Sequence, residues 1–232
     1  EDVTTGIQTA LATILGAVSA EQGANIRAVM TGTTHLTNAV VERRGLRKTA
    51  VVRIGLPAAS SIAPMTNWPE DLKQKLAGPV YMIEGGHEFD GRPIVDFDEA
   101  GMERAARDIR DKGIDAIAIT AVFSPLNAAC EERAAEIIER IVPDATLTLS
   151  HSLGKIGLIE RENATILNSA LQGLARHTIR AFSRSVSESG LSAPVYLTQN
   201  DGTVVRADQA EKFPVLCFAS GPTNSMRGAR QL

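Results

Sequence analysis

A short threonine-rich segment, Thr31 to Asn38, has residue types and spacing that can do chemistry. It reads TGTTHLTN and follows the apolar residues 28–30, so we expect a short buried strand that runs through a glycine-containing turn into a helix. A helix N-terminus presents unpaired backbone N–H groups and the positive end of a dipole, which suits an anion. The simpler interpretation is that the hydroxyls of Thr33 and Thr34 only cap the helix. His35 can act as an acid or base near neutral pH, although a histidine without an identified partner is more often structural.

Two later segments also combine glycine with polar side chains. Asn200-Asp201-Gly202 is first of all the signature of a tight hairpin turn. The segment Ser220 to Gly228, SGPTNSMRG, follows an apolar run that we expect to be a buried strand. We expect it to form a loop in which the backbone can approach a ligand closely.

Metal sites and the common catalytic motifs are disfavoured. None of the four histidines stands in an HxH or HExxH arrangement, so a zinc amidohydrolase built only from this chain is a weak interpretation. Glu160 and Glu162 place carboxylates at the start of a long helix, where favourable interaction with the helix dipole is the simpler role. The absence of GxGxxG, GxxxxGKS/T, GxSxG and protein-kinase signatures disfavours a Rossmann dehydrogenase, a P-loop NTPase, an α/β-hydrolase and a protein kinase.

The composition is that of an ordinary globular protein. Of the 232 residues, 44% are hydrophobic and 22% charged, and the formal net charge is −3. This balance, together with an aromatic content of 4%, argues against a dedicated nucleic-acid binder. Cys130 and Cys217 lie far apart and outside any CxxC pair, so we expect reduced thiols in a cytoplasmic protein. We expect no membrane-spanning segment, because no apolar run approaches the required length of about 20 residues.

In the first half of the chain, the hydrophobic periodicity predicts helices over Thr4 to Gln22 and His35 to Arg44 and a strand over Thr49 to Ile54. Residues 56–78 hold prolines and small residues and are expected to form a long surface loop. Residues 80–83 and 92–95, on either side of Asp90-Gly91, are expected to pair as a hairpin within residues 80–95.

The second half begins with alternating helices and strands. Helical stripes end at Gly113 and Pro143, and strands are expected over Ile114 to Thr120 and Thr146 to Ser150. Strands that alternate with helices predict an α/β fold with a mainly parallel sheet flanked by helices. A long helix is then expected at residues 161–189. A hairpin at residues 194–206 and a last strand at residues 215–219 are expected to follow it.

Several segments together resemble the hydantoinase/oxoprolinase family. They are TGTTHLTNAVVERRG, GIDAIAITAVFSPLN, SHSLGKIGLIERENATILNSAL, LTQNDGTVV and FASGPTNSMRGA, and they occur in the family's order over nearly the whole chain. Members include ATP-dependent 5-oxoprolinases, the large subunit of N-methylhydantoinases and related subunits of acetone- and acetophenone-type carboxylases. The family resembles the actin-like and sugar-kinase-like ATPases, so this resemblance implies that the chain is part of such an α/β fold.

The resemblance implies ATP and Mg²⁺ as cofactors, a cyclic amide as substrate and a second subunit of the hydantoinase B type as partner. In the ATPases that the family resembles, two Asp-Gly-Gly-Thr-like loops hold phosphate and Mg²⁺, and neither loop occurs here. By comparison the chain starts after the first loop and stops before the second, and its ends look like cuts through a longer polypeptide. We therefore expect residues 1–160 to be an N-terminal hydantoinase/oxoprolinase region and 161–232 the start of a second domain. The chain alone should hold no nucleotide tightly.

Candidate site residues follow from positions that match the family's motifs. His35 and Asp201 are the expected catalytic residues. The residues expected to line the substrate and nucleotide cleft are Thr33, Thr34, Asn38, Asn200, Gly202, Ser220, Gly221 and Pro222. Two departures from the pattern leave the substrate subclass open. Thr203 replaces the second glycine of the turn, and residues 224–227 are bulkier and more polar than in many members.

Three functions stay open at this point. The first is a fragment of an ATP-dependent hydrolase that opens cyclic amides of the hydantoin or 5-oxoproline type by phosphoryl activation of the ring amide. The second is a subunit of an ATP-dependent ketone carboxylase. The third is a non-catalytic module that keeps only the fold.

Overall fold

The computed structural model describes residues 3–231 and divides into two compact units. One unit combines Glu1–Arg44 with Gln172–Leu232, and the other is Gly45–Leu171. The boundary expected between residues 160 and 161 separates two regions of the sequence and not these two compact units, and it stays a prediction.

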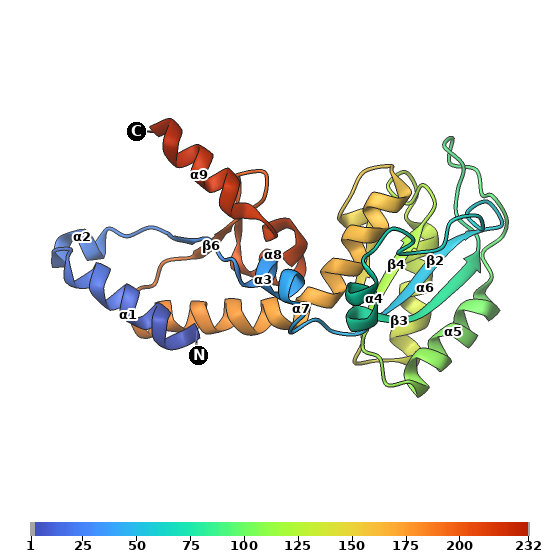
Figure 1. The fold of residues 1–232 in the computed structure, drawn as a ribbon, viewed down its shortest axis with the longest axis horizontal. Coiled ribbons are helices and arrows are strands. Elements are labelled where there is room, and N and C mark those ends of the chain that lie inside the picture. The colour runs from blue at the N-terminus through green and yellow to red at the C-terminus, as the bar shows by residue number, and fades with distance from the viewer. Residues whose placement is uncertain (1–2, 232) are drawn as a thin grey trace. The chain divides into compact units, whose positions relative to one another are not determined.

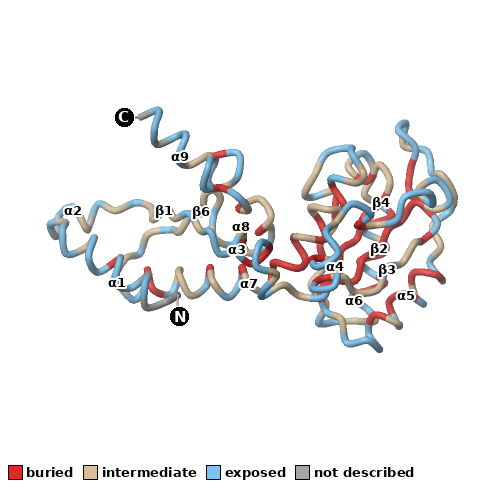
Figure 2. The backbone as a smooth tube through the Cα atoms, in the orientation of Figure 1, coloured by how far each residue is buried: buried red, intermediate tan, exposed pale blue. Residues whose placement is uncertain are grey.

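The unit of residues 45–171 is built on a four-stranded parallel sheet with strand order β3-β2-β4-β5 (Figure 1). The strands are β2 (Thr49–Leu56), β3 (Ala77–Glu84), β4 (Ala116–Ala121) and β5 (Thr146–Leu149). Buried residues run along nearly the whole of β2 and β4 (Figure 2), as expected for central strands of a sheet covered on both faces. The predicted α/β fold with a mainly parallel sheet is confirmed.

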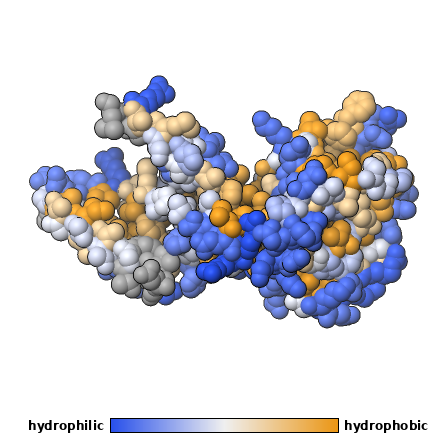
Figure 3. Space-filling model, viewed as in Figure 1, coloured by the Kyte–Doolittle hydropathy of each residue, from blue (hydrophilic) through white to orange (hydrophobic). Residues whose placement is uncertain are grey.

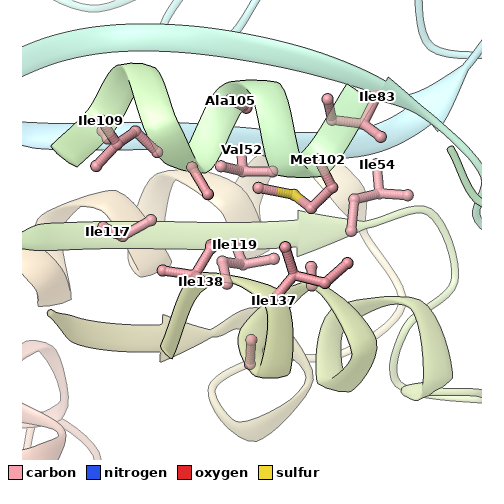
Figure 4. Packing of buried hydrophobic residues seen from close by; sticks show 14 of the residues in the cluster. Val52, Ile54, Ile83, Met102, Ala105, Ile109, Ile117, Ile119, Ile137 and Ile138 are labelled. Atoms are coloured by element: carbon pink, nitrogen blue, oxygen red, sulfur yellow. The ribbon is translucent and has the colours of Figure 1, made fainter. Parts of the chain in front are cut away.

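Two helices, α5 (Glu99–Asp111) and α6 (Ala129–Ile141), pack against one face of this sheet. Alternate residues of the central strands, including Val52 and Ile119, point into the same apolar cluster as the helix residues Met102 and Ile138 (Figure 4). The cluster forms because a strand exposes every second side chain to one face, while α5 and α6 carry their apolar residues at helical spacing.

The opposite face of the sheet carries buried polar residues among apolar ones and is covered by the first half of α7 (Leu158–Glu188). The strand residues Arg53 and Thr148 bond to the α7 residues Glu162 and Ser169, respectively. This helix begins three residues before the predicted start and is otherwise confirmed.

Two local predictions for this unit are wrong. Residues 56–78 are not one long loop, because they contain α4 (Glu70–Leu76) and the start of β3. Six of the seven residues of α4, EDLKQKL, are good helix formers, and Asp71 stands in its first turn, where an acidic residue is favourable. Residues 80–95 are not a hairpin of two strands, because β3 pairs in parallel with β2. The predicted tight turn does form, with Gly91 at φ +85° and an isolated antiparallel bridge between His87 and Pro93.

The other unit holds a smaller sheet of three strands, ordered β1-β6-β7. Strand β1 (Val29–Thr31) is parallel to β6 (Val195–Thr198), which forms the predicted hairpin with β7 (Val204–Arg206). The expected first helix is broken into α1 (Val3–Gly16) and α2 (Ala20–Ala24), because Ser19 caps α2 through a capping box with Gln22. Helices α3 (His35–Glu42) and α8 (Ala207–Lys212) and the second half of α7 complete most of the unit.

The predicted strand at residues 215–219 and the predicted loop after it are both wrong. Residues Pro214–Cys217 form a 3-10 helix, η2, and Ser220–Gln231 form α9. A short apolar run such as VLCFA does not separate strand from buried helix. Proline is tolerated in the first turn of a helix, where its missing N–H is not needed, so Pro222 does not prevent α9 from starting at Ser220.

Cys130 and Cys217 are both buried and free, and burial raises the pKa of the Cys217 thiol to about 11. Within residues 3–231, no helix has the length and apolar character needed to cross a lipid bilayer. On the face drawn in Figure 3, the unit of residues 45–171 is hydrophilic at the end where α5 finishes and more hydrophobic towards the other end.

Candidate functional site

The first candidate segment lies where β1 passes into α3. The backbone N–H of His35 donates to the hydroxyl of Thr33 at 3.1 Å, whereas Thr34, at the N-cap position, makes no side-chain capping bond. The capping interpretation therefore holds for Thr33 only. His35 and Asn38 are both exposed on the first turn of α3.

The second candidate segment, residues 200–202, forms the turn between β6 and β7. Asp201 Oδ1 accepts hydrogen bonds from the backbone N–H and the hydroxyl of Thr203, at 2.8 and 2.7 Å. The bond from the Thr203 backbone, followed by that from its hydroxyl and the charge of Arg227, holds the pKa of Asp201 below its usual range. Asp201 is thus an exposed, ionised carboxylate near neutral pH, suited to bind a cation rather than to act as an acid.

The backbone conformation of this turn and its close contacts require glycine at position 202. It lies at φ +82°, and a Cβ there would stand 2.8 Å from both Arg227 Nε and Thr223 Cγ2. The turn residue therefore fits closely against α9.

The third candidate segment is the first turn of α9, and the structure brings it against the other two. Its Thr223 hydroxyl donates to the carbonyl of Asn200 at 2.8 Å, and the N–H of Ala219, just before α9, donates to Thr37 Oγ1 at 3.0 Å. Ser220 is buried and lies 3.4 Å from Thr198 Oγ1, while Gly221 and Pro222 are exposed. Asn224, one of the residues that departs from the family pattern, bonds to the same threonine hydroxyl at 2.9 Å.

The approach of these segments also explains a glycine in the first motif. A Cβ on Gly32 would lie 3.1 Å from Asn224 Nδ2 and 3.2 Å from Thr198 Oγ1, so the chain passes close to α9 and β6 here. Three segments, the first of which precedes the other two by more than 150 residues of sequence, therefore form one polar constellation within the same unit.

A pocket of about 120 Å³ opens beside this constellation. Thr33 and His35 line its polar side, and its apolar wall includes Ile179 and Phe182 of α7. The remaining candidates, Thr34, Asn38, Asn200, Asp201, Gly202, Ser220, Gly221 and Pro222, are not among its lining residues. The structure thus places His35 at a pocket and Asp201 outside it.

A buried polar network in the unit of residues 45–171 escaped the sequence analysis. Glu131 accepts bonds from the N–H of Ala121 at 2.8 Å, from the Ser150 hydroxyl at 2.5 Å, and from the backbone N–H and Nδ1 of His151 at 3.0 and 2.7 Å. The guanidinium of Arg161 bonds to Ser150 Oγ at 2.8 Å and to the carbonyl of Ala121.

At the start of α7, Glu160 and Glu162 were both expected to interact mainly with the helix dipole, and this expectation fits Glu160 only. Glu160 is exposed in the first turn, whereas Arg161 and Glu162 are buried among polar partners. The pattern that reveals this face is a run of polar residues at helical spacing, namely Arg161, Glu162, Thr165, Asn168, Ser169 and Gln172. Within residues 3–231, no three His, Cys, Asp or Glu side chains gather as a group that could hold a metal ion.

Comparison with protein families identifies the chain's relatives. The model of the hydantoinase/oxoprolinase N-terminal region matches residues 1–142, and the hydantoinase/oxoprolinase model matches residues 161–232. The caprolactamase subunit alpha of Pseudomonas jessenii is 25% identical over 97% of this chain. An uncharacterized protein of Methanocaldococcus jannaschii is 24% identical over 61% of it. The chain spans 34% and 21% of these two relatives, respectively.

Solved structures show the same fold. The ATP-dependent caprolactamase from Pseudomonas jessenii superposes with a TM-score of 0.76 and 25% identity over 95% of this chain and 34% of its own. A nucleotide-free acetone carboxylase matches with a TM-score of 0.74 over 94% of this chain and 33% of its own, but at 18% identity this likeness shows the fold alone. Two family models together cover most of the sequence. The chain belongs to the hydantoinase/oxoprolinase family.

Proposed function

We propose that this chain is part of an ATP-dependent enzyme that opens cyclic amides of the hydantoin or 5-oxoproline type. The observation that carries the proposal is the match to a caprolactamase subunit along 97% of the chain, because that relative acts on a cyclic amide. The related solved structure is that of an ATP-dependent caprolactamase, which supports ATP as the co-substrate. A second subunit of the hydantoinase B type and a cytoplasmic location are part of the same proposal.

The chemistry explains why such an enzyme uses ATP. A ring amide is a poor electrophile, and its oxygen is a poor leaving group. Transfer of the terminal phosphoryl group of ATP to the amide oxygen releases ADP and lets water attack the carbonyl carbon. The ring nitrogen then leaves as an amine, which breaks the C–N bond, opens the ring and leaves an acyl phosphate. A second water attacks the same carbon and displaces inorganic phosphate by cleavage of the C–O bond, so that a carboxylate remains. Such transfer depends mainly on positioning and on stabilisation of negative charge.

The constellation in the unit of residues 1–44 and 172–232 is suited to part of this task. The backbone N–H groups at the start of α3 and the hydroxyl of Thr34 fit an anionic group. His35 lies exposed at the pocket, where it can exchange a proton with a bound ligand. Among the described residues, no cluster of carboxylates could hold Mg²⁺. The same proposal places the metal and most phosphate contacts on Asp-Gly-Gly-Thr-like loops, which do not occur in this sequence.

The isolated 232-residue chain is therefore expected to show no measurable ATP hydrolysis. It should also bind ATP with Mg²⁺ far more weakly than at micromolar concentrations, because the phosphate-binding loops are not in this sequence. Calorimetric titration of the chain with ATP and Mg²⁺ checks this. Micromolar affinity would contradict the assignment of those contacts to other parts of the protein.

Replacement of His35 by alanine in the full-length enzyme is expected to lower kcat by about 10²–10⁴-fold, the range typical of a lost acid–base group. His177→Ala, which removes another exposed histidine of the same unit, is the matched control and should leave kcat unchanged. Steady-state kinetics of both variants decide the question. A normal kcat for His35→Ala would make His35 a structural residue.

Two other functions compete with this proposal. A ketone carboxylase subunit shares the fold, as the acetone carboxylase structure shows, and a non-catalytic module would keep the fold without activity. ATP hydrolysis by the full-length protein with its partner subunit separates them. Stimulation by hydantoins, 5-oxoproline or ε-caprolactam supports the hydrolase, stimulation by acetone with bicarbonate supports the carboxylase, and silence with every substrate supports the module.

A further inference from the structure

A second pocket lies in the unit of residues 45–171, at the carboxyl ends of the parallel strands β2 and β4. Its volume is about 230 Å³. The carboxyl edge of a parallel sheet is where α/β proteins usually bind ligands. The pocket is lined by Arg53, Ala58, Ala59, Ser61, Ile62, Val122, Leu158 and Ile159.

One lining residue is half of a buried ion pair. Arg53 Nε donates to Glu162 Oε1 at 2.7 Å, and its Nη2 donates to the other carboxylate oxygen. Both side chains are 1% exposed. Burial of two charges costs so much desolvation energy that well-packed apolar residues usually serve stability as well or better. Stability alone therefore does not account for this pair, and its position beside a cavity suggests a ligand.

The guanidinium has hydrogen-bonding capacity beyond the pair. Three of its N–H groups bond to Glu162 and to the carbonyl of Ile62. An arginine carries further N–H donors on Nη1 and Nη2. Because Arg53 lines the pocket, we expect these groups to donate to an acceptor oxygen of a ligand there, and the hydroxyl of Ser61, which also lines the pocket, offers a second donor.

The rest of the lining restricts the ligand. Six of the eight lining residues are alanine, valine, leucine or isoleucine, so the body of the ligand should be hydrocarbon. Because Glu162 already balances the charge of Arg53, the pocket offers no net charge that would attract a charged ligand. We propose that this pocket binds a small uncharged carbonyl compound, with its oxygen towards Arg53 and its hydrocarbon part against the aliphatic wall.

The choice of a lactam and a ketone as probes rests on the proposed function. Both compounds carry an uncharged carbonyl group on a hydrocarbon body. The binding itself is measured on the isolated chain without ATP. Failure of the binding test would leave the proposed function standing. Conversely, an inactive full-length enzyme would not affect the binding result.

The test is a titration of the isotope-labelled 232-residue chain with ε-caprolactam, acetone and 5-oxoproline, followed by nuclear magnetic resonance. Saturable shifts are expected for the Arg53 Nε–H signal and for the backbone amides of residues 58–62 and 122. The carboxylate of 5-oxoproline should weaken its binding at least about 10-fold relative to caprolactam. Tighter binding of caprolactam identifies the lactam as the source, and tighter binding of acetone identifies the ketone. Absence of saturable shifts with both would overturn the proposal.

Two variants locate the site. Ala58→Phe fills the pocket and should weaken binding at least about 10-fold, whereas Ala63→Phe places the same side chain on an exposed neighbour that does not line it. The double variant Arg53→Met with Glu162→Met removes the charges without leaving one unpaired, so it should fold and lose the preference for a carbonyl. Unchanged binding in Ala58→Phe, or in a folded double variant, would contradict the assigned pocket.

Discussion

Replacement of Glu162 by alanine is expected to lower the free energy of unfolding by about 3–5 kcal/mol, because it leaves the guanidinium of Arg53 buried and unpaired. The transition to follow is that of the unit containing residues 45–171. Its Trp68 is the single tryptophan of the sequence and bonds through Nε1 to Asn163 Oδ1 at 2.8 Å. Urea unfolding followed by tryptophan fluorescence therefore measures the stability of this unit.

Glu160→Ala is the matched control on the same helix. Its side chain is exposed, so the expected change is within about 0.5 kcal/mol. The double variant Arg53→Met with Glu162→Met should recover most of the loss, because it removes the orphaned charge. If Glu162→Ala were as stable as Glu160→Ala, the ion pair would not be buried as described.

The second large effect is expected at Glu131. Its replacement by alanine should cost about 3–5 kcal/mol, because donors from Ala121, Ser150 and His151 lose their shared acceptor in the interior. The control is Glu132→Ala, one residue further along α6 and exposed. Equal stability of the two variants would show that the network contributes nothing.

The same network predicts how stability depends on pH. The hydrogen bond to Glu131 is the main cause that raises the pKa of His151 above 6.5. The stability that the protonated His151 adds to the folded state is therefore complete below pH 6.5 and is lost as the pH rises through the folded-state pKa. Burial alone would raise the pKa of Glu131, but hydrogen bonds from His151 and Ser150 outweigh it and hold the value below 4.5. The stability that the ionised Glu131 adds to the folded state is present above pH 4.5 and is lost as the pH falls from there through the folded-state pKa.

The network should therefore stabilise the protein most between pH 4.5 and 6.5. Glu131→Gln should flatten the loss of stability above pH 6.5, whereas Glu132→Gln should largely keep it. Urea unfolding of the unsubstituted protein and of both variants, from pH 5 to 8, measures this difference. If Glu131→Gln lost stability above pH 6.5 as steeply as the unsubstituted protein, the pair of His151 and Glu131 would not be the source of that loss.

Sequence patterns predicted the elements whose partners are close in sequence or whose faces differ clearly in polarity. The alternation of helices and strands between residues 99 and 149 gave the correct parallel sheet, because α5 and α6 carry distinct apolar stripes. The turn at Asp90-Gly91 was also correct. The pairing of its flanks was wrong, because β3 finds a better partner in β2, more than 20 residues earlier in the chain.

The candidate site was predicted less completely than the fold. Motif resemblance singled out three segments that the structure does bring together, although nothing in their spacing indicates contact between Asn200 and Thr223. The polar face of α7 was missed because polar residues on a helix usually face solvent, and here they face Arg53 and Thr148 of the sheet. The roles of His35 and Asp201 remain predictions.

The most direct test of the proposed function follows the oxygen atom of the ring amide. The full-length protein with its partner subunit would receive a cyclic amide whose carbonyl carries oxygen-18, together with ATP and Mg²⁺, and the released phosphate would be analysed by mass spectrometry. Phosphoryl activation of the amide predicts that the label appears in inorganic phosphate as the ring opens. Ring opening and ATP hydrolysis with all of the label left in the product carboxylate would contradict it.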